Sequence, residues 1–423
     1  MISQVRIARG LTALLATHVA LGSALAAETP TPPAETSWTD VLRLAREATP
    51  RLALERASVS LAAADRRTAG ELPNPSLNLG REKPTGGGAT LFDGDKLDTV
   101  GLEMPLHAPG LRSARIRAAD QTLMAARNHA QAHVNTLAAD AGEAFIELLL
   151  AQREVDVLTG AQQELKKLHD VVEARQQNGV SSQYDLLRLD VEIASWRGRL
   201  HEAQTDVIDR QAQLATLLGF SGWQPVATGD LRALAEQLKP DDGVFDVATH
   251  PAMVAAAAEQ ASAESRVTLA ERERLPEISL DVDKSRTTAP FGASRHVGVS
   301  VEVPIMNRRQ GSLDHARAEA DAAAQERRLT EAELSTDIAR SAQVATHRLQ
   351  VLEQFDGQVA KRLPELKDMA EVAYRVGNTP MVELLDAART RYEAQLEQAK
   401  LEAELAEARL DVAQARGALG VRF

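Results

Sequence analysis

The sequence contains an internal repeat of about 200 residues, and this duplication constrains the fold more than any other feature. Four landmarks occur in the same order in both halves. They are residues 72–77 and 275–280 (LPNPSL and LPEISL), 100–106 and 299–305 (VGLEMPL and VSVEVPI), 179–187 and 377–385 (GVSSQYDLL and GNTPMVELL), and 218–219 and 419–420 (LG in both). Because the offset is nearly constant, we expect two tandem copies of one structural unit.

Each copy predicts a helix, a proline-marked strand, a loop, a second strand, and two very long helices joined at a Gly turn. The first helices lie at about 38–70 and 246–273. The first copy (28–220) has strands at about 72–81 and 97–106 and long helices at about 111–178 and 182–218. The second copy (246–423) has strands at about 275–285 and 295–305 and long helices at about 308–375 and 380–419. Residues 221–245 predict an irregular equatorial connector with a short helix at about 231–238.

The predicted strands alternate between apolar and polar residues. In the fourth strand one face carries Val297, Val299, Val301, Val303 and Ile305, and the other carries Gly298, Ser300 and Glu302. Alternation of period two is typical of a barrel wall with lipid outside and water inside. It is equally typical of a half-buried soluble hairpin, so the strands alone leave both interpretations open.

The long helices carry sustained heptad patterns. Apolar residues recur every seven positions at Leu186, Ile193, Leu200, Val207 and Leu214. Such heptads predict supercoiled helices packed side by side. The helix at 111–178 would be about 100 Å long at a rise of 1.5 Å per residue. A helix of that length belongs to a fibre, a tether or a tall tube rather than to a compact domain.

The first 27 residues predict a cleaved secretory signal peptide, since Arg6 and Arg9 precede a short apolar stretch that ends in an A-x-A site at 24–26. No later apolar segment is long enough for a spanning helix, so membrane contact must come from strands or from one face of a helix. The chain has no cysteine and therefore neither disulfides nor a lipidated N-terminal cysteine. The formal charge of −12 argues against nucleic acid as a partner.

Four strands are too few to close a barrel, because about eight is the smallest number that leaves a filled interior. Open strand edges do not occur in lipid, so four membrane strands per chain require oligomerisation. Three copies would give twelve strands and twelve long helices. The predicted fold class is therefore mainly α with a membrane β part: two tandem repeats of strand-strand-long helix-turn-long helix that form a trimeric 12-stranded β-barrel continued by a 12-helix α-barrel.

The segments 374–379 (YRVGNT) and 382–387 (VELLDA), together with the doubled plan, resemble the TolC family of outer-membrane efflux proteins. The resemblance covers nearly the whole mature chain. It implies a passive export duct with a β-barrel in the outer membrane and an α-helical barrel that extends into the periplasm. The compact length and the absence of a lipobox look most like the cobalt–zinc–cadmium branch of heavy-metal efflux.

The resemblance also implies the partners: two further copies in a homotrimer, outer-membrane lipid, a periplasmic adaptor (membrane fusion) protein and an inner-membrane pump of the RND type. It assigns contact with the adaptor's helical hairpin to the turns Asn178-Gly179-Val180 and Val376-Gly377-Asn378. By the same analogy, Asp185 and Tyr374 form hydrogen bonds that hold the periplasmic mouth closed. The family pattern has an arginine where this chain has Thr379, so a latch in this chain lacks that salt bridge.

An acidic pair follows the second Gly turn. Glu383 and Asp386 are three residues apart, and this spacing places them on one helix face. Threefold symmetry would bring six carboxylates into rings at the periplasmic aperture, as in cation-selective constrictions. Crowded like charges would favour an open or cation-bound mouth. The alternative is an ordinary solvated acidic face.

Other candidate sites are weaker. His129 and His133 have the four-residue spacing of a shared metal site, but no third ligand type is clustered nearby, and no metal site is predicted.

The chain contains no serine-protease arrangement, metalloprotease motif or nucleotide fingerprint, which predicts a non-enzyme without cofactors. Two alternatives to the duct are a periplasmic adaptor and a coiled-coil scaffold without a channel.

Overall fold

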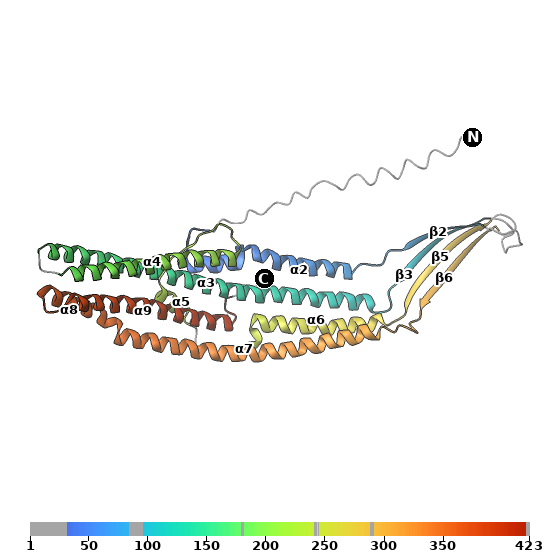
Figure 1. Cartoon of the computed structure of the whole chain (residues 1–423). Coiled ribbons are helices and arrows are strands. Elements are labelled where there is room, and N and C mark those ends of the chain that lie inside the picture. The colour runs from blue at the N-terminus through green and yellow to red at the C-terminus, as the bar shows by residue number, and fades with distance from the viewer. Residues whose placement is uncertain are drawn as a thin grey trace, which may run out of the picture. The chain divides into compact units, whose positions relative to one another are not determined.

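The structure is a computed structural model that describes residues 32–83, 96–178, 182–240, 243, 245–287 and 292–419; the predicted signal peptide lies outside these residues. The fold is mostly helical (Figure 1). The helices are α1 (Trp38–Arg43), α2 (Pro50–Ala69), α3 (Leu111–Gln177), α4 (Gln183–Leu218), α5 (Leu231–Gln237), α6 (Pro251–Glu273), α7 (Gln310–Gln358), α8 (Leu363–Val376) and α9 (Met381–Ala415). The strands are β1 (Glu35–Thr36), β2 (Ser76–Glu82), β3 (Leu97–Leu106), β4 (Val226–Ala227), β5 (Glu277–Thr287) and β6 (Ala293–Glu302).

Four strands form one antiparallel sheet in the order β2-β3-β5-β6. The central pairing of β3 with β5, from Leu97↔Thr287 to Leu106↔Ile278, joins the two halves of the chain. The register places apolar side chains opposite one another across all four strands in the row Leu77, Leu102, Val282 and Val297. We call the side of the sheet that carries this row the apolar face.

The apolar face is open in the single chain: Leu79 is 73% exposed and Val297 is 70% exposed. The opposite side is the polar face, and the register places Asn78, Glu103, Asp281, Asp283, His296 and Ser300 on it. A continuous exposed apolar surface of this kind marks a site of contact with lipid or protein. This exposure does not fit the soluble half-buried hairpin.

The long helices pack as two antiparallel pairs, α3 with α4 and α7–α8 with α9, and α6 lies between α3 and α7 (Figure 1). Two large hydrophobic cores and a small cluster between α6 and α7 hold them. One surrounds Trp38 and Phe145 and includes Phe220, the last residue of the first copy, and Trp223 of the connector. The other, nearer the helix turns, surrounds Trp196. No helix among the described residues is both long and apolar enough to be a membrane-spanning segment.

Two helices that were predicted as continuous are interrupted. The helix predicted at 38–70 becomes α1, a π-helical turn (Leu44–Ala48) and α2, because Pro50 has no N–H and Thr49 takes an extended conformation that caps α2. The helix predicted at 308–375 is divided into α7, a 3₁₀ turn (Ala360–Arg362) and α8. Pro364 explains this second break, since proline is tolerated only in the first turn of a helix.

Candidate functional site at the helical hairpin tips

The first hairpin turn lies between α3 and α4. The side-chain amide of Asn178 donates to the carbonyl of Ala174 over 2.7 Å and closes the end of α3. Gly179 and Val180 lie outside the described residues. The helix α4 begins with a capping box, in which the Asp185 amide donates to Ser182 Oγ (3.1 Å) and the Ser182 amide donates to Asp185 Oδ2 (3.2 Å). Asp185 therefore has a local structural role, and its Oδ1 makes no hydrogen bond within the described chain.

The second hairpin turn depends on glycine. Gly377 has φ +81°, and it ends α8 with two hydrogen bonds: its own amide donates to Tyr374 O (3.1 Å) and the amide of Asn378 donates to Ala373 O (2.9 Å). This is a Schellman motif, in which a left-handed residue reverses the chain. Val376 is 67% exposed, and Gly377 and Asn378 are exposed as well. The predicted adaptor-contacting residues of this turn are therefore accessible in the single chain.

The acidic pair lies one turn into α9. Glu383 and Asp386 are exposed, whereas Met381, Leu384 and Leu385 of the same helix are buried. The two carboxylates therefore share the outer face of α9, as their spacing predicted. Glu383 lies in the first helical turn, where the helix dipole favours a negative charge. Neither carboxylate forms an ion pair within the described parts of the chain, so both are available to ions.

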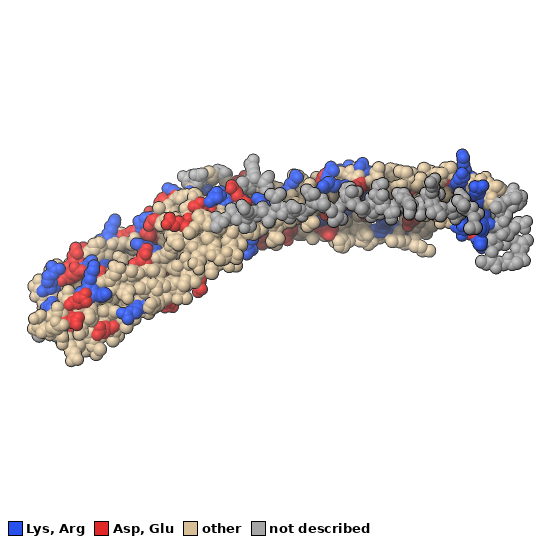
Figure 2. Space-filling view, turned by 90° about the horizontal axis from the view of Figure 1, so that it is seen from above, with Lys and Arg blue, Asp and Glu red and all other residues tan. Residues whose placement is uncertain are grey.

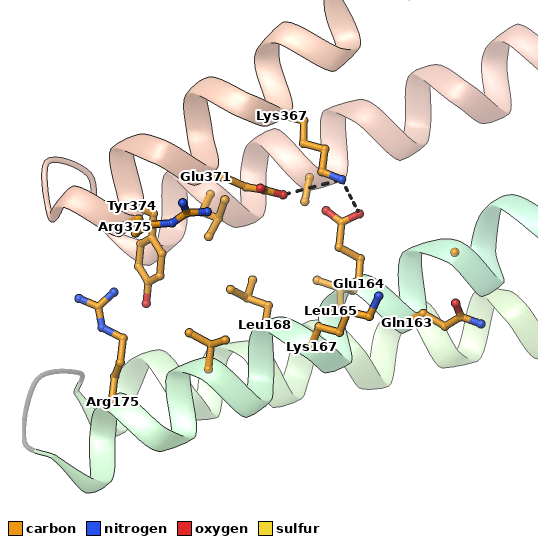
Figure 3. A pocket seen from close by; sticks show the side chains of 14 residues that line it. Gln163, Glu164, Leu165, Lys167, Leu168, Arg175, Lys367, Glu371, Tyr374 and Arg375 are labelled. Carbon is orange, nitrogen blue, oxygen red and sulfur yellow. Dashed lines mark ion pairs between the residues drawn. The ribbon is translucent and has the colours of Figure 1, made fainter.

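Tyr374 contacts the first hairpin from the second. The Arg175 guanidinium of α3 lies 5.1 Å from the centroid of the Tyr374 ring, which is a cation–π distance. Figure 3 shows the two side chains facing each other between the turns. They lie at one end of an open pocket of about 430 Å³ lined by α3, α8 and α9, with Leu165, Leu168 and Leu384 among its apolar lining. No hydrogen bond of the Tyr374 hydroxyl is formed within the described chain.

An ionic cluster at the inner end of this cavity was not predicted from the sequence. Arg391, buried on α9, forms an ion pair with Glu164 of α3, and the Tyr392 hydroxyl donates to the same carboxylate. Burial opposes ionisation of Glu164, but the hydrogen bonds from Tyr392 and Arg391 lower its pKa below the ordinary value. Lys367 of α8 lies 4.0 Å from Glu164 and 3.8 Å from Glu371 (Figure 3). This cluster connects three helices of the two hairpins.

The two histidines of α3 do not converge. His129 Nε2 lies 3.7 Å from Glu259 of α6, whereas His133 Nδ1 lies 2.9 Å from Glu55 of α2. Their partners belong to different helices, so the four-residue spacing serves helix packing. Among the described residues, no group of three or more His, Asp and Glu side chains could hold a metal ion.

Comparison with known proteins identifies the family. The family model described as outer membrane efflux protein matches residues 41–220 and 247–418. The chain is 26% identical to the cobalt-zinc-cadmium resistance protein CzcC of Cupriavidus metallidurans, over 71% of this chain and 72% of that protein. It is 29% identical to the pyoverdine export outer membrane protein OpmQ of Pseudomonas putida, over 69% of this chain and 64% of that protein.

Solved structures share the fold. The chain is similar to CusC, with a TM-score of 0.75, 17% identity and coverage of 92% of this chain and 93% of that chain. It is also similar to the Campylobacter jejuni CmeC outer membrane channel, with a TM-score of 0.75, 14% identity and coverage of 91% and 86%.

These matches confirm the resemblance to the TolC family that the sequence predicted. The chain is an outer-membrane efflux channel component of a tripartite system, located in the outer membrane and extending into the periplasm. With matched segments that cover most of its length, the chain belongs to the outer membrane efflux protein family.

Proposed function

We propose that three copies of the chain form a passive duct, with a 12-stranded barrel in the outer membrane and a 12-helix tube in the periplasm. The observation that carries this proposal is the sheet, which has an exposed apolar face and two open edges, β2 and β6. Unpaired edges are not tolerated in lipid, so each edge must pair with a neighbouring copy. Neighbouring strands alternate in direction, and β6 therefore meets the next β2 in antiparallel orientation.

The polar face of the sheet would line the bore. It carries Glu103, Asp281 and Asp283, and a trimer repeats these carboxylates three times around the channel. Rings of carboxylates favour cations over anions. Together with the similarity to a cobalt-zinc-cadmium resistance protein, this acidic lining supports heavy-metal cations, or other small toxic solutes, as the cargo.

The hairpin tips would form the periplasmic aperture. Glu383 and Asp386 are exposed and unpaired, so threefold symmetry can gather them into carboxylate rings at the narrow end. Asp185 Oδ1 and the Tyr374 hydroxyl are both available for a hydrogen bond between neighbouring chains. Arg175, which holds the Tyr374 ring, would orient that hydroxyl.

The partners follow from this arrangement. The exposed turns at Asn178, Gly179 and Val180 and at Val376, Gly377 and Asn378 would contact a periplasmic adaptor protein. An inner-membrane pump of the RND type would supply the energy and choose the cargo. We expect the chain itself to catalyse no reaction, because the proteins that it resembles are channels rather than enzymes.

Conductance of the purified protein in planar bilayers tests the proposal. We expect discrete channels that prefer cations, measured as the reversal potential in a KCl gradient. The double variant Glu383→Ala with Asp386→Ala should move the reversal potential toward that of an unselective pore. The control Glu326→Ala with Glu331→Ala removes the same charge from the exposed surface of α7 and should leave it unchanged.

The possible outcomes separate the two parts of the proposal. Channels with an unchanged reversal potential in the tip variant would remove the aperture assignment and keep the duct. The absence of channels from well-folded trimeric protein would contradict the duct itself.

A further inference from the structure

The apolar face of the sheet changes character along its strands. Near the helices its rows are aliphatic: Leu106, Ile278 and Val301, then Met104, Leu280 and Val299. Toward the loops of the two hairpins the rows become charged. The first mixed row is Leu79, Val100, Lys284 and Arg295, and the last row is Arg81, Asp98, Arg286 and Ala293. We call Arg81, Lys284, Arg286 and Arg295 the basic belt.

Among the described residues, the positive charge of the belt exceeds the negative charge in the same two rows. Asp98 is the one carboxylate in these two rows, and it binds Arg81 at 2.6 Å. Lys284 and Arg295 are direct cross-strand neighbours, an arrangement of like charges that destabilises a sheet. The belt residues are exposed, and Lys284, Arg286 and Arg295 form no ion pair within the described chain. Figure 2 shows basic side chains gathered over the strand end. An external anion would relieve this repulsion.

The position of the belt identifies the source of that anion, provided that the proposed barrel forms. The helices leave the sheet at its Leu106 end, so the belt lies at the opposite end, on the outer-leaflet side of the membrane. On β3 the apolar side chains of this face run from Val100 to Leu106, and on β6 they run from Val297 to Val301. Lysine and arginine on the lipid-facing side of a barrel are costly at the membrane midplane and tolerated near its interfaces. The belt therefore lies at the depth of the lipid headgroups.

The strands also lack the usual interfacial anchors. Membrane barrels carry aromatic girdles where the apolar band meets the headgroups. Residues of β2, β3, β5 and β6 include no Phe, Tyr or Trp. The arginine-rich belt occupies the place of a girdle, and guanidinium groups bind phosphate oxygens in a bidentate manner.

We propose that the basic belt is a binding surface for the phosphate groups of phosphorylated lipids in the outer leaflet. Arg286, Arg295 and Lys284 bind the phosphates, and Asp98 holds Arg81 in position beside them. In the trimer the belt occurs three times around the barrel, so the lipid headgroups fix its depth in the membrane.

Lipid binding to the detergent-purified full-length trimer tests this inference, with native mass spectrometry as the readout. The probes are diphosphorylated lipid A, the same lipid after removal of both phosphates, and inorganic phosphate. The belt variant is Lys284→Gln, Arg286→Gln and Arg295→Gln. The control variant, Arg153→Gln, Arg197→Gln and Arg328→Gln, removes three exposed positive charges from the long helices.

We expect the natural chain and the control variant to bind diphosphorylated lipid A at least tenfold more tightly than the dephosphorylated lipid. The belt variant should lose that difference. The charge-conserving variant Arg286→Lys with Arg295→Lys should keep most of it, and it provides a test if the belt variant fails to form trimers. Equal binding of both lipids to the natural chain, or binding of inorganic phosphate that displaces the lipid, would overturn the inference. Conductance of the same trimers shows independently whether they form the proposed channel.

Discussion

Glu407 on α9 should destabilise the protein at neutral pH. Burial, followed by repulsion from the nearby carboxylates Glu143, Glu147, Glu404 and Asp411, raises its pKa from the ordinary value of 4.5 to about 7. The neighbouring arginine side chains already form ion pairs with other carboxylates. Arg210 binds Glu147 and Arg348 binds Glu404, each at 2.6 Å, and Glu407 has no ion pair within the described chain.

The sign and size of the effect follow from proton linkage. Because the folded-state pKa is raised, the native protein retains a proton that the unfolded chain has released, so stability falls as the pH rises from about 4.5 to 7. The full shift corresponds to about 3 kcal/mol. Glu407 is only partly buried, and solvent screening reduces the expected effect to about 1–2 kcal/mol.

The variant Glu407→Gln removes the charge and keeps the shape of the side chain. At pH 8 its unfolding temperature should exceed that of the natural chain by roughly 2 °C, and at pH 4.5 the two should coincide. Circular dichroism of the detergent-purified protein measures both. The control Glu397→Gln alters an exposed carboxylate of the same helix, and the difference between its unfolding temperature and that of the natural chain should be the same at both pH values. If Glu407→Gln raised the unfolding temperature equally at both pH values, or lowered it at pH 8, the linkage argument would be refuted.

Three further predictions concern named contacts. Gly377→Ala forces a side chain into φ +81° and should lower the free energy of unfolding by about 1 kcal/mol, measured by chemical denaturation. Arg391→Met leaves Glu164 partly buried without its guanidinium partner and should lower the free energy of unfolding by about 3 kcal/mol. Hydrogen exchange should show faster opening of the hairpin tips, and an unchanged exchange rate would contradict this prediction. Burial lowers the pKa of His250, so stability should fall as the pH drops below about 6.5, and His250→Asn should weaken that dependence in acid denaturation curves.

Features that depend on local pattern were predictable from the sequence. Alternation of period two assigned Val297, Val299 and Val301 to one face of the fourth strand, and the register confirms that assignment. The left-handed turn at Gly377 likewise follows from residues next to it in the chain. The helix break at Pro50 has a local signal as well, since proline is disfavoured inside a helix, and the prediction of one continuous helix at 38–70 was wrong.

Features that depend on contacts between distant residues were not predictable. Arg391 and Glu164 are 227 residues apart, and nothing in either local pattern marks them as partners. The capping role of Asp185 was also missed, although Ser182 three residues earlier is a recognisable capping-box signal. The basic belt became visible only when the register placed residues from three strands in adjacent rows.

Cross-linking between neighbouring chains tests the central claim most directly, because the chain contains no cysteine of its own. Asn78→Cys on the edge strand β2 is combined in turn with Ser294→Cys, His296→Cys or Ser300→Cys on the edge strand β6. All four residues lie on the polar face. These pairs sample the possible registers across the joint.

The account predicts that at least one double variant, oxidised in outer-membrane fractions, gives covalent dimers and trimers and nothing larger, while the single variants remain monomers. Exclusively monomeric protein in all three double variants, or a ladder that continues beyond the trimer, would contradict a closed barrel of three chains.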